Sequence, residues 1–185
     1  MAIQLEQRLI TVEEYHKMAS AGILNADDRV ELLYGKIIKM SPIGSKHAAC
    51  VDKIDELLKR LLAGKAIVRV QNPLIMDDLS EPEPDIAVVI RKENYYADKH
   101  PSAEDVYLAI EVADFSLEKD RQIKLPIYAG ARIPEFWIIN LEKQELEVYQ
   151  SPFKEQYRSK HTFFPGDEVS LPHFDIPLPV SSLLV

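Results

Sequence analysis

The sequence predicts an α/β or α+β fold in which a mixed β-sheet is flanked by helices, with a helix and a β-hairpin at the N-terminus. Two observations predict it. Helix-like and strand-like segments follow one another in the order helix, hairpin, helix, several strands, helix and two strands. In addition, runs such as D-I-A-V-V-I (85–90) are aliphatic without alternation, which is typical of strands covered on both faces.

Length and composition favour one globular domain spanning residues 1–185. Hydrophobic residues make up 46% of the chain, which is enough for a substantial core. No apolar stretch approaches the roughly 20 residues of a membrane helix, and the first residues, MAIQLEQRLI, do not resemble a secretory signal. Cys50 is the only cysteine, so an intramolecular disulfide and a zinc site of several thiolates are excluded. We therefore expect a cytoplasmic protein without a membrane partner.

Residues 1–45 are expected to hold the N-terminal helix and hairpin. Thr11 and Glu14 have the spacing of a capping box, so a short helix should run to about Met18. The stretch N-A-D-D (25–28) predicts a turn. In R-V-E-L-L-Y-G-K-I-I-K-M (29–40), two strand-like halves meet at Gly35, which indicates a hairpin.

Periodic and aliphatic segments fill the middle of the chain. Residues 47–62 carry apolar side chains every three or four positions, as an amphipathic helix does, and Gly64 should end it. A polar loop or short helix is expected over 92–104. The expected strands are 66–70, 74–76, 85–90, 106–112, 136–140 and 145–149.

The last third should contain one more helix and an irregular end. Ser116 is a suitable N-cap for a helix reaching Ala129, and Pro126 should kink that helix. From residue 163 to 185, prolines interrupt short apolar pieces. We therefore expect irregular C-terminal strands and an irregular tail there.

Four residues are candidates for a chemical site: Glu31, Asp85, Glu111 and Lys124. A buried carboxylate such as Glu111 is costly unless it is paired or bound to a metal. Carboxylates that converge from neighbouring strand ends provide the oxygen ligands that Mg²⁺ prefers. Such an ion can activate a water for attack on a phosphodiester, and a nearby lysine can orient or deprotonate that water or stabilise the developing charge.

Each candidate also has an ordinary structural explanation. Asp85 fits a solvated strand edge, Glu111 fits a buried ion pair, and Glu31 fits the surface of a hairpin. Lys124 fits an exposed helix position paired with Asp120 one turn earlier. Spacing does not decide between these alternatives, because the strand register is unknown from sequence.

Several segments together resemble the Uma family of predicted endonucleases, which has a restriction endonuclease-like, PD-(D/E)xK nuclease core. The resemblance covers about residues 10 to 150. The matching segments are T-V-E-E-Y (11–15), V-E-L-L-Y-G-K-I-I-K-M-S-P (30–42), His47, P-D-I-A-V-V (84–89), I-E-V-A-D (110–114), D-R-Q-I-K-L-P-I-Y-A (120–129) and I-P-E-F-W-I-I-N (133–140).

The resemblance implies a four-stranded mixed sheet and a set of site residues. Asp85 and Glu111 are implied to bind Mg²⁺ or Mn²⁺, and Glu31 to add a direct or water-mediated ligand. The motif lysine is missing, because Ala113 stands in its place. Lys124, on the following helix, is implied to replace it.

The resemblance implies that His47 binds substrate, and Lys46, next to it in the sequence, is also expected to bind substrate. His47 also fits a partly buried structural histidine. Trp137 and Tyr128 are expected in the core, and Gln71 has a marginal role at most.

These observations predict a metal-dependent endonuclease that hydrolyses DNA with a metal-activated water, acting as a homodimer. The net charge of −8 speaks against binding by general phosphate neutralisation, so a local positive surface is needed. That surface is expected from Lys36, Lys39, Lys46, Lys119 and Arg121. The alternatives are a nuclease-fold binding or scaffold protein with little or no cleavage, and a hydrolase of RNA or small phosphoesters.

Overall fold

A computed structural model describes residues 7–25, 27–114 and 116–185. Residue 26 of the predicted turn lies outside the described residues. The elements, in chain order, are α1 (Val12–Ser20), β1 (Val30–Leu33), β2 (Lys36–Lys39), α2 (Ser45–Leu61), β3 (Ala66–Val70), β4 (Ile86–Ile90), η1 (Ala103–Asp105), β5 (Val106–Ala113), α3 (Leu117–Lys119), η2 (Asp120–Lys124), α4 (Leu125–Gly130), β6 (Glu135–Asn140), β7 (Glu145–Phe153), β8 (Gln156–Phe163), β9 (Glu168–Leu171), β10 (Ile176–Pro179) and η3 (Val180–Ser182).

A six-stranded mixed sheet in the order β3-β4-β5-β6-β7-β8 forms the centre of the molecule. Only β5 and β6 are parallel among these strands, so the predicted mixed sheet is confirmed. It has more strands than the expected four, partly because β8 was not predicted. β8 is an edge strand whose side chains are largely exposed, so its sequence, Q-Y-R-S-K-H-T-F, lacks the apolar run that marks a buried strand.

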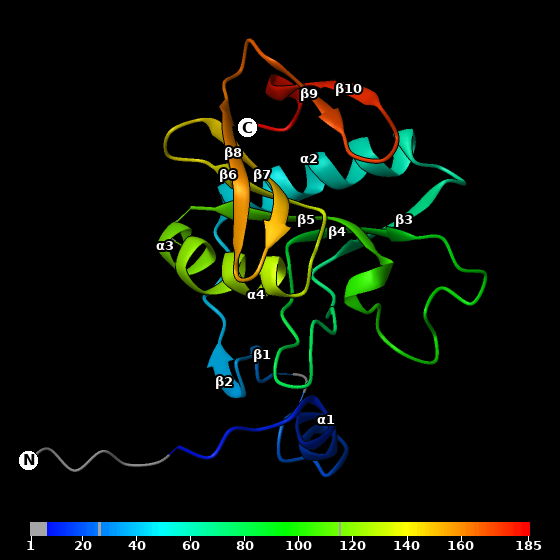
Figure 1. Cartoon of the computed structure of the whole chain (residues 1–185), viewed down its shortest axis with the longest axis vertical. Coiled ribbons are helices and arrows are strands. Elements are labelled where there is room, and N and C mark those ends of the chain that lie inside the picture. The colour runs from blue at the N-terminus through cyan, green and yellow to red at the C-terminus, as the bar shows by residue number, and fades with distance from the viewer. Residues whose placement is uncertain (1–6, 26, 115) are drawn as a thin grey trace, which may run out of the picture.

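The two faces of the sheet have different coverings (Figure 1). Helix α2 and the β9–β10 segment cover one face, where residues such as Ile110 and Val112 of β5 join an apolar core. The segment from α3 to α4 and the β1–β2 hairpin lie on the other face. Because strand side chains alternate, Glu111 points to this second face.

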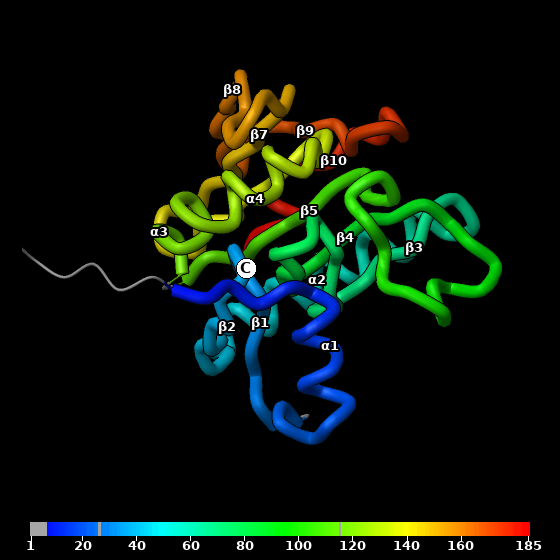
Figure 2. Tube along the Cα trace, turned by 60° about the horizontal axis from the view of Figure 1, so that its bottom comes forward, coloured from blue at the N-terminus to red at the C-terminus, as the bar shows by residue number. Residues whose placement is uncertain are grey.

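The N-terminal helix and hairpin are confirmed. Thr11 and Glu14 form the predicted capping box at the start of α1. The hairpin turns at Tyr34 and Gly35, which both have positive φ, as a two-residue turn between antiparallel strands requires. A Cβ on Gly35 would lie 2.6 Å from the Leu9 Cβ, so only glycine fits there. Figures 1 and 2 show α1 and this hairpin together at one end of the molecule, away from β8, β9 and β10.

The helix predicted after β5 is present, but it is not one regular helix. The π-helical turn η2 separates the short α3 from α4. Pro126 lies in the first turn of α4, where a missing backbone N–H is tolerated. The irregular part of the helix is therefore the π-helical turn before Pro126, and not the proline itself.

Residues 163–185 contain strands, as expected, but these strands are regular and packed rather than irregular. Strands β9 and β10 pair in an antiparallel hairpin, and Leu171, Leu178 and Leu183 are buried in the core beneath α2. Pro177 and Pro179 stand in β10, and a two-stranded hairpin tolerates proline because each of its strands has a free edge. Among the described residues, no helix is long and apolar enough to cross a membrane.

Candidate active site

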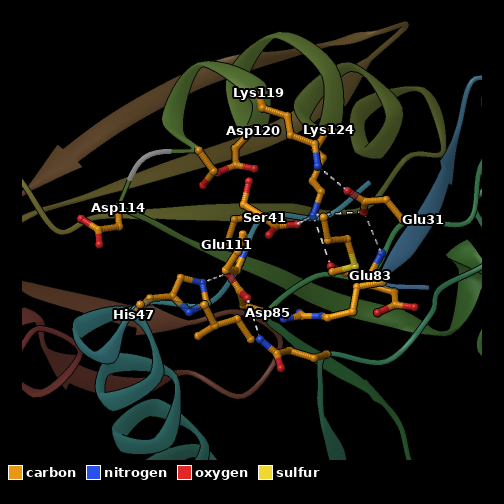
Figure 3. A pocket seen from close by; sticks show the side chains of 17 residues that line it. Glu31, Ser41, His47, Glu83, Asp85, Glu111, Asp114, Lys119, Asp120 and Lys124 are labelled. Carbon is orange, nitrogen blue, oxygen red and sulfur yellow. Dashed lines mark hydrogen bonds and ion pairs between the residues drawn. The ribbon is translucent and has the colours of Figure 1, made fainter. Parts of the chain in front are cut away.

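A pocket opens on the second face of the sheet, between the β1–β2 hairpin, the start of α2 and the helical segment after β5 (Figure 3). Its lining comes from segments far apart in the chain. It contains six carboxylates but only two lysines and one arginine. These charged residues are Glu31, Glu83, Asp85, Glu111, Asp114, Asp120, Arg29, Lys119 and Lys124.

Asp85 lies immediately before β4 and is fixed by three neighbours. Its Oδ2 accepts a hydrogen bond from the Val112 backbone N–H at 2.8 Å and lies 3.0 Å from His47 Nε2. The Gln71 side chain contacts Oδ1 at 3.4 Å. The carboxylate thus caps the strand end and joins β4 to β5 at the edge of the pocket. This contact explains why an acidic residue precedes a buried strand.

Glu111 and Lys124 form a buried ion pair at the bottom of the pocket. The Lys124 Nζ lies 2.8 Å from Glu111 Oε1, which also accepts a hydrogen bond from the Tyr128 hydroxyl at 3.0 Å. Lys124 also donates to the Glu83 carbonyl oxygen at 3.2 Å. Both charged side chains are less than 5% exposed. The lysine of the helical segment therefore reaches the strand carboxylate, as Figure 3 shows.

Glu31 lies on the hairpin side of the pocket and binds two lysines of the helical segment after β5. Its Oε1 lies 2.6 Å from the Lys119 Nζ, and its Oε2 lies 3.4 Å from the Lys124 Nζ. The Glu83 backbone N–H also donates to Oε2, at 3.2 Å. Both lysines outweigh the effect of burial, so the pKa of Glu31 is lowered.

The pKa of Glu111 shifts in the opposite direction from that of Glu31. Burial raises the pKa of Glu111 well above its ordinary value, because Lys124 does not offset the combined effect of burial, Asp120 and Asp85. Burial would lower the pKa of Lys124, but the charges of Glu111, Glu31 and Asp120 raise it. Lys124 therefore stays protonated at neutral pH, whereas an ionised Glu111 lacks full compensation.

The structure brings five of the six predicted site residues to this pocket: Glu31, Asp85, Glu111, Lys124 and His47. Lys46 is exposed and lines a different hollow beside Leu141 and Gln144, so its substrate role stays a prediction.

The expected local positive surface does not gather at the pocket. Of Lys36, Lys39, Lys46, Lys119 and Arg121, only Lys119 lines it, while Arg121 is bound to Glu147. Trp137 is fully buried in the core, as predicted. Tyr128 is fully buried too, but its hydroxyl also contacts the site.

Some of the ordinary explanations were wrong, and several charged pocket residues, Asp120 among them, were missed. Lys124 and Asp120 are buried, so they are not an exposed helix-surface pair. Asp120 lines the pocket, accepts a hydrogen bond from the Ser116 hydroxyl at 2.6 Å and has a pKa raised by burial. Its position four residues before Lys124, on the same helix face, was the available signal.

The residues present fit a divalent cation of the Mg²⁺ type. No three His, Cys, Asp or Glu side chains among the described residues are already placed to hold a metal ion. Mg²⁺ is commonly held by only one or two carboxylates, with water and substrate oxygens as its other ligands. Glu111 Oε2 makes no hydrogen bond within the described chain, and Asp85 Oδ1 makes only the long contact to Gln71. Asp85 and Glu111 could each therefore offer a free oxygen to the ion.

Comparisons with known proteins agree with this architecture. The chain is similar to a solved structure described as a putative nuclease belonging to DUF820 from Anabaena variabilis ATCC 29413, with 22% identity, a TM-score of 0.77, and coverage of 94% of this chain and 97% of that one. At this identity the similarity shows a shared fold. No match was found among curated proteins. Residues 12–181 match the model of the Uma2 family, described as "Putative restriction endonuclease". The chain therefore belongs to the Uma2 family of putative restriction endonucleases.

Proposed function

We propose that the protein is a metal-dependent endonuclease that hydrolyses phosphodiester bonds in DNA. The family assignment and the nuclease fold support a nuclease. The observation that carries the finer proposal is the pair Asp85 and Glu111. Their carboxylates come from two adjacent strands, face one pocket, and each has an oxygen without a strong partner.

In this proposal Asp85 and Glu111 hold Mg²⁺ or Mn²⁺. When bound, such an ion supplies positive charge at the phosphate and lowers the pKa of an attacking water. Lys124 directs its ammonium at Glu111, Glu83 and Glu31, so it orients Glu111 and adds positive charge to the pocket. Because Lys124 remains protonated, it does not act as the general base.

The acidic character of the pocket supports a cation-dependent reaction. Six carboxylates surround a space that must accept a negatively charged phosphodiester. Without a cation, these groups repel the substrate. A divalent ion placed between Asp85 and Glu111 reduces that repulsion at the reacting phosphate. The same argument accounts for nuclease activity in a chain of net charge −8.

Two further expectations belong to this proposal. Cutting both strands of a duplex requires two sites, so we propose that the active form is a homodimer. We also propose that it acts in the cytoplasm, on DNA accessible there.

Incubation of supercoiled plasmid with the protein and Mg²⁺ or Mn²⁺ tests the proposal, with Asp85→Ala as the matched control. Nicked or linear plasmid that disappears in Asp85→Ala and in the presence of EDTA is expected. Calorimetric Mn²⁺ binding without cleavage of any nucleic acid would favour the binding or scaffold alternative. Cleavage confined to RNA or to a model phosphoester such as bis(p-nitrophenyl) phosphate would favour the third alternative.

A further inference from the structure

We propose that Glu31 is a positioning residue that holds Lys124 and Lys119 at the pocket, and that it is not a metal ligand. This inference rests on the proposed function, because it assigns a role within the same site. It differs from the role that the family resemblance implies for Glu31. The contacts of the carboxylate, its burial and the geometry of η2 support it.

Both oxygens of the Glu31 carboxylate already face a positively charged partner. The side chain is fully buried, and each oxygen already meets a lysine ammonium. The Glu83 backbone N–H occupies a further lone pair of Oε2. A metal at Glu31 would have to displace an ammonium group from a buried carboxylate, which leaves a buried charge without its partner. Glu111 differs, because its Oε2 makes no hydrogen bond within the described chain.

The π-helical turn explains how one carboxylate reaches two lysines. Lys119 and Lys124 are five residues apart, and η2 spans Asp120–Lys124. In an α-helix, residues three or four apart share a face, whereas residues five apart do not. A π-helical turn hydrogen-bonds residues five apart and stacks them. The wider turn therefore places both ammonium groups on the same side, where the β1 strand presents Glu31.

The hairpin thereby contributes to a site built on the central sheet. β1 and β2 form a separate two-stranded sheet, so Glu31 reaches the pocket from outside the six-stranded sheet. Without its negative charge, Lys119 and Lys124 would face each other across the same space and repel. We expect Lys124 then to move from Glu111, so that its positive charge no longer lies where the phosphodiester would bind.

The variant Glu31→Gln, compared with Asp85→Asn, separates a positioning role from ligation. Mn²⁺ affinity, measured by calorimetry, is expected to change less than threefold in Glu31→Gln and to fall more than tenfold in Asp85→Asn. Plasmid cleavage at saturating Mn²⁺ is expected to fall about 30-fold in Glu31→Gln. A loss of Mn²⁺ affinity in Glu31→Gln as large as in Asp85→Asn would overturn the proposal, and so would unchanged cleavage.

A double-mutant cycle with Lys124→Met provides a readout that a merely structural role would not produce. If Glu31 acts through Lys124, adding Glu31→Gln to Lys124→Met lowers cleavage by less than threefold further. If the loss of cleavage in the double variant equalled the product of the losses in the two single variants, the proposal would be contradicted. If Glu31→Gln does not fold, Lys119→Met replaces it in the test, because Lys119 is partly exposed. Lys119→Met is then expected to lower cleavage clearly and to change Mn²⁺ affinity little. If wild-type protein cleaves nothing, the proposed function fails, while the Mn²⁺ affinities still decide the role of Glu31.

Discussion

Glu111 and Glu147 lie in one row of the same sheet face, yet their surroundings differ. Glu111 pairs across β5 and β6 with Ile138, which pairs with Glu147 on β7. Each carboxylate is buried, contacts a tyrosine hydroxyl and binds a cationic residue from η2. For Glu111 that cation is Lys124, and for Glu147 it is Arg121.

The two carboxylates differ in charge balance. Glu147 binds both Arg121 and Lys160, and it accepts a hydrogen bond from the Tyr149 hydroxyl. Burial would raise the pKa of Glu147, but these three contacts lower it to about 2. Burial raises the pKa of Glu111, and the one lysine that it shares with Glu31 does not offset burial and the nearby carboxylates Asp120 and Asp85. A buried carboxylate with full compensation stabilises the fold, whereas one that lacks it is available to bind a cation. Burial alone therefore does not distinguish structural from functional acids.

The largest expected difference between the two carboxylates is in cleavage. Replacing Glu111 with Gln removes a charge from the proposed metal site, so the plasmid cleavage rate should fall by about 10³-fold. The matched substitution Glu147→Gln should leave the rate within about twofold of wild type. Gel-based rates at saturating Mn²⁺ provide the measurement. A Glu111→Gln variant of normal activity would remove the proposed metal site.

A smaller loss is expected from the two cations of η2. Lys124→Met leaves the metal ligands in place but removes the group that orients Glu111, so cleavage should fall by about 10²-fold. Arg121→Met removes the equivalent partner of Glu147 and should change cleavage less than threefold. Thermal melts of both variants control for unfolding. Equal losses in the two variants would mean that η2 acts only as a structural support.

The comparison predicts different effects on stability. Glu147→Gln leaves both Arg121 and Lys160 without a carboxylate, so the free energy of unfolding should decrease by about 2 kcal/mol. Glu111→Gln removes an undercompensated charge but also the nearest partner of the buried Lys124, which keeps Glu31, so the decrease should be smaller, about 1 kcal/mol. Urea unfolding at pH 7 measures both values. A greater loss in Glu111→Gln than in Glu147→Gln would contradict the assignment of Glu147 as the stabilising acid.

The smallest expected effect is a pH dependence due to Glu147. Its pKa falls from 4.5 in the unfolded chain to about 2 in the folded protein. The folded state thus binds this proton less readily, so the stabilisation is full above about pH 4.5 and decreases as the pH falls toward 2. Linkage with these two pKa values narrows the stability gap between wild type and Glu147→Gln by at most about 2 kcal/mol between pH 5 and pH 2.5, and solvent screening at the exposed partner Lys160 reduces the expected narrowing to roughly 1 kcal/mol. Urea unfolding series at several pH values measure that gap, and a constant gap would refute the assigned pKa.

Local sequence was sufficient for the elements whose signals are local. The capping box of Thr11 and Glu14, the apolar period of α2 and the turn at Gly35 each depend on residues close together in the chain. Residue chemistry and the resemblance to a family both pointed to Asp85, Glu111 and Lys124, which the structure brings into one pocket. The roles given to them as metal ligands and helper lysine remain proposals.

Tertiary structure decided what depends on distant contacts. The edge strand β8 and the β9–β10 hairpin lack a strong pattern of their own and are fixed by pairing and by packing beneath α2. Only the folded arrangement shows that Glu31 lies against two lysines, and that Asp120 turns into the pocket. Sequence determines which groups can ionise. The pairing of strands determines which charges meet, because each charge is compensated by residues from another part of the chain.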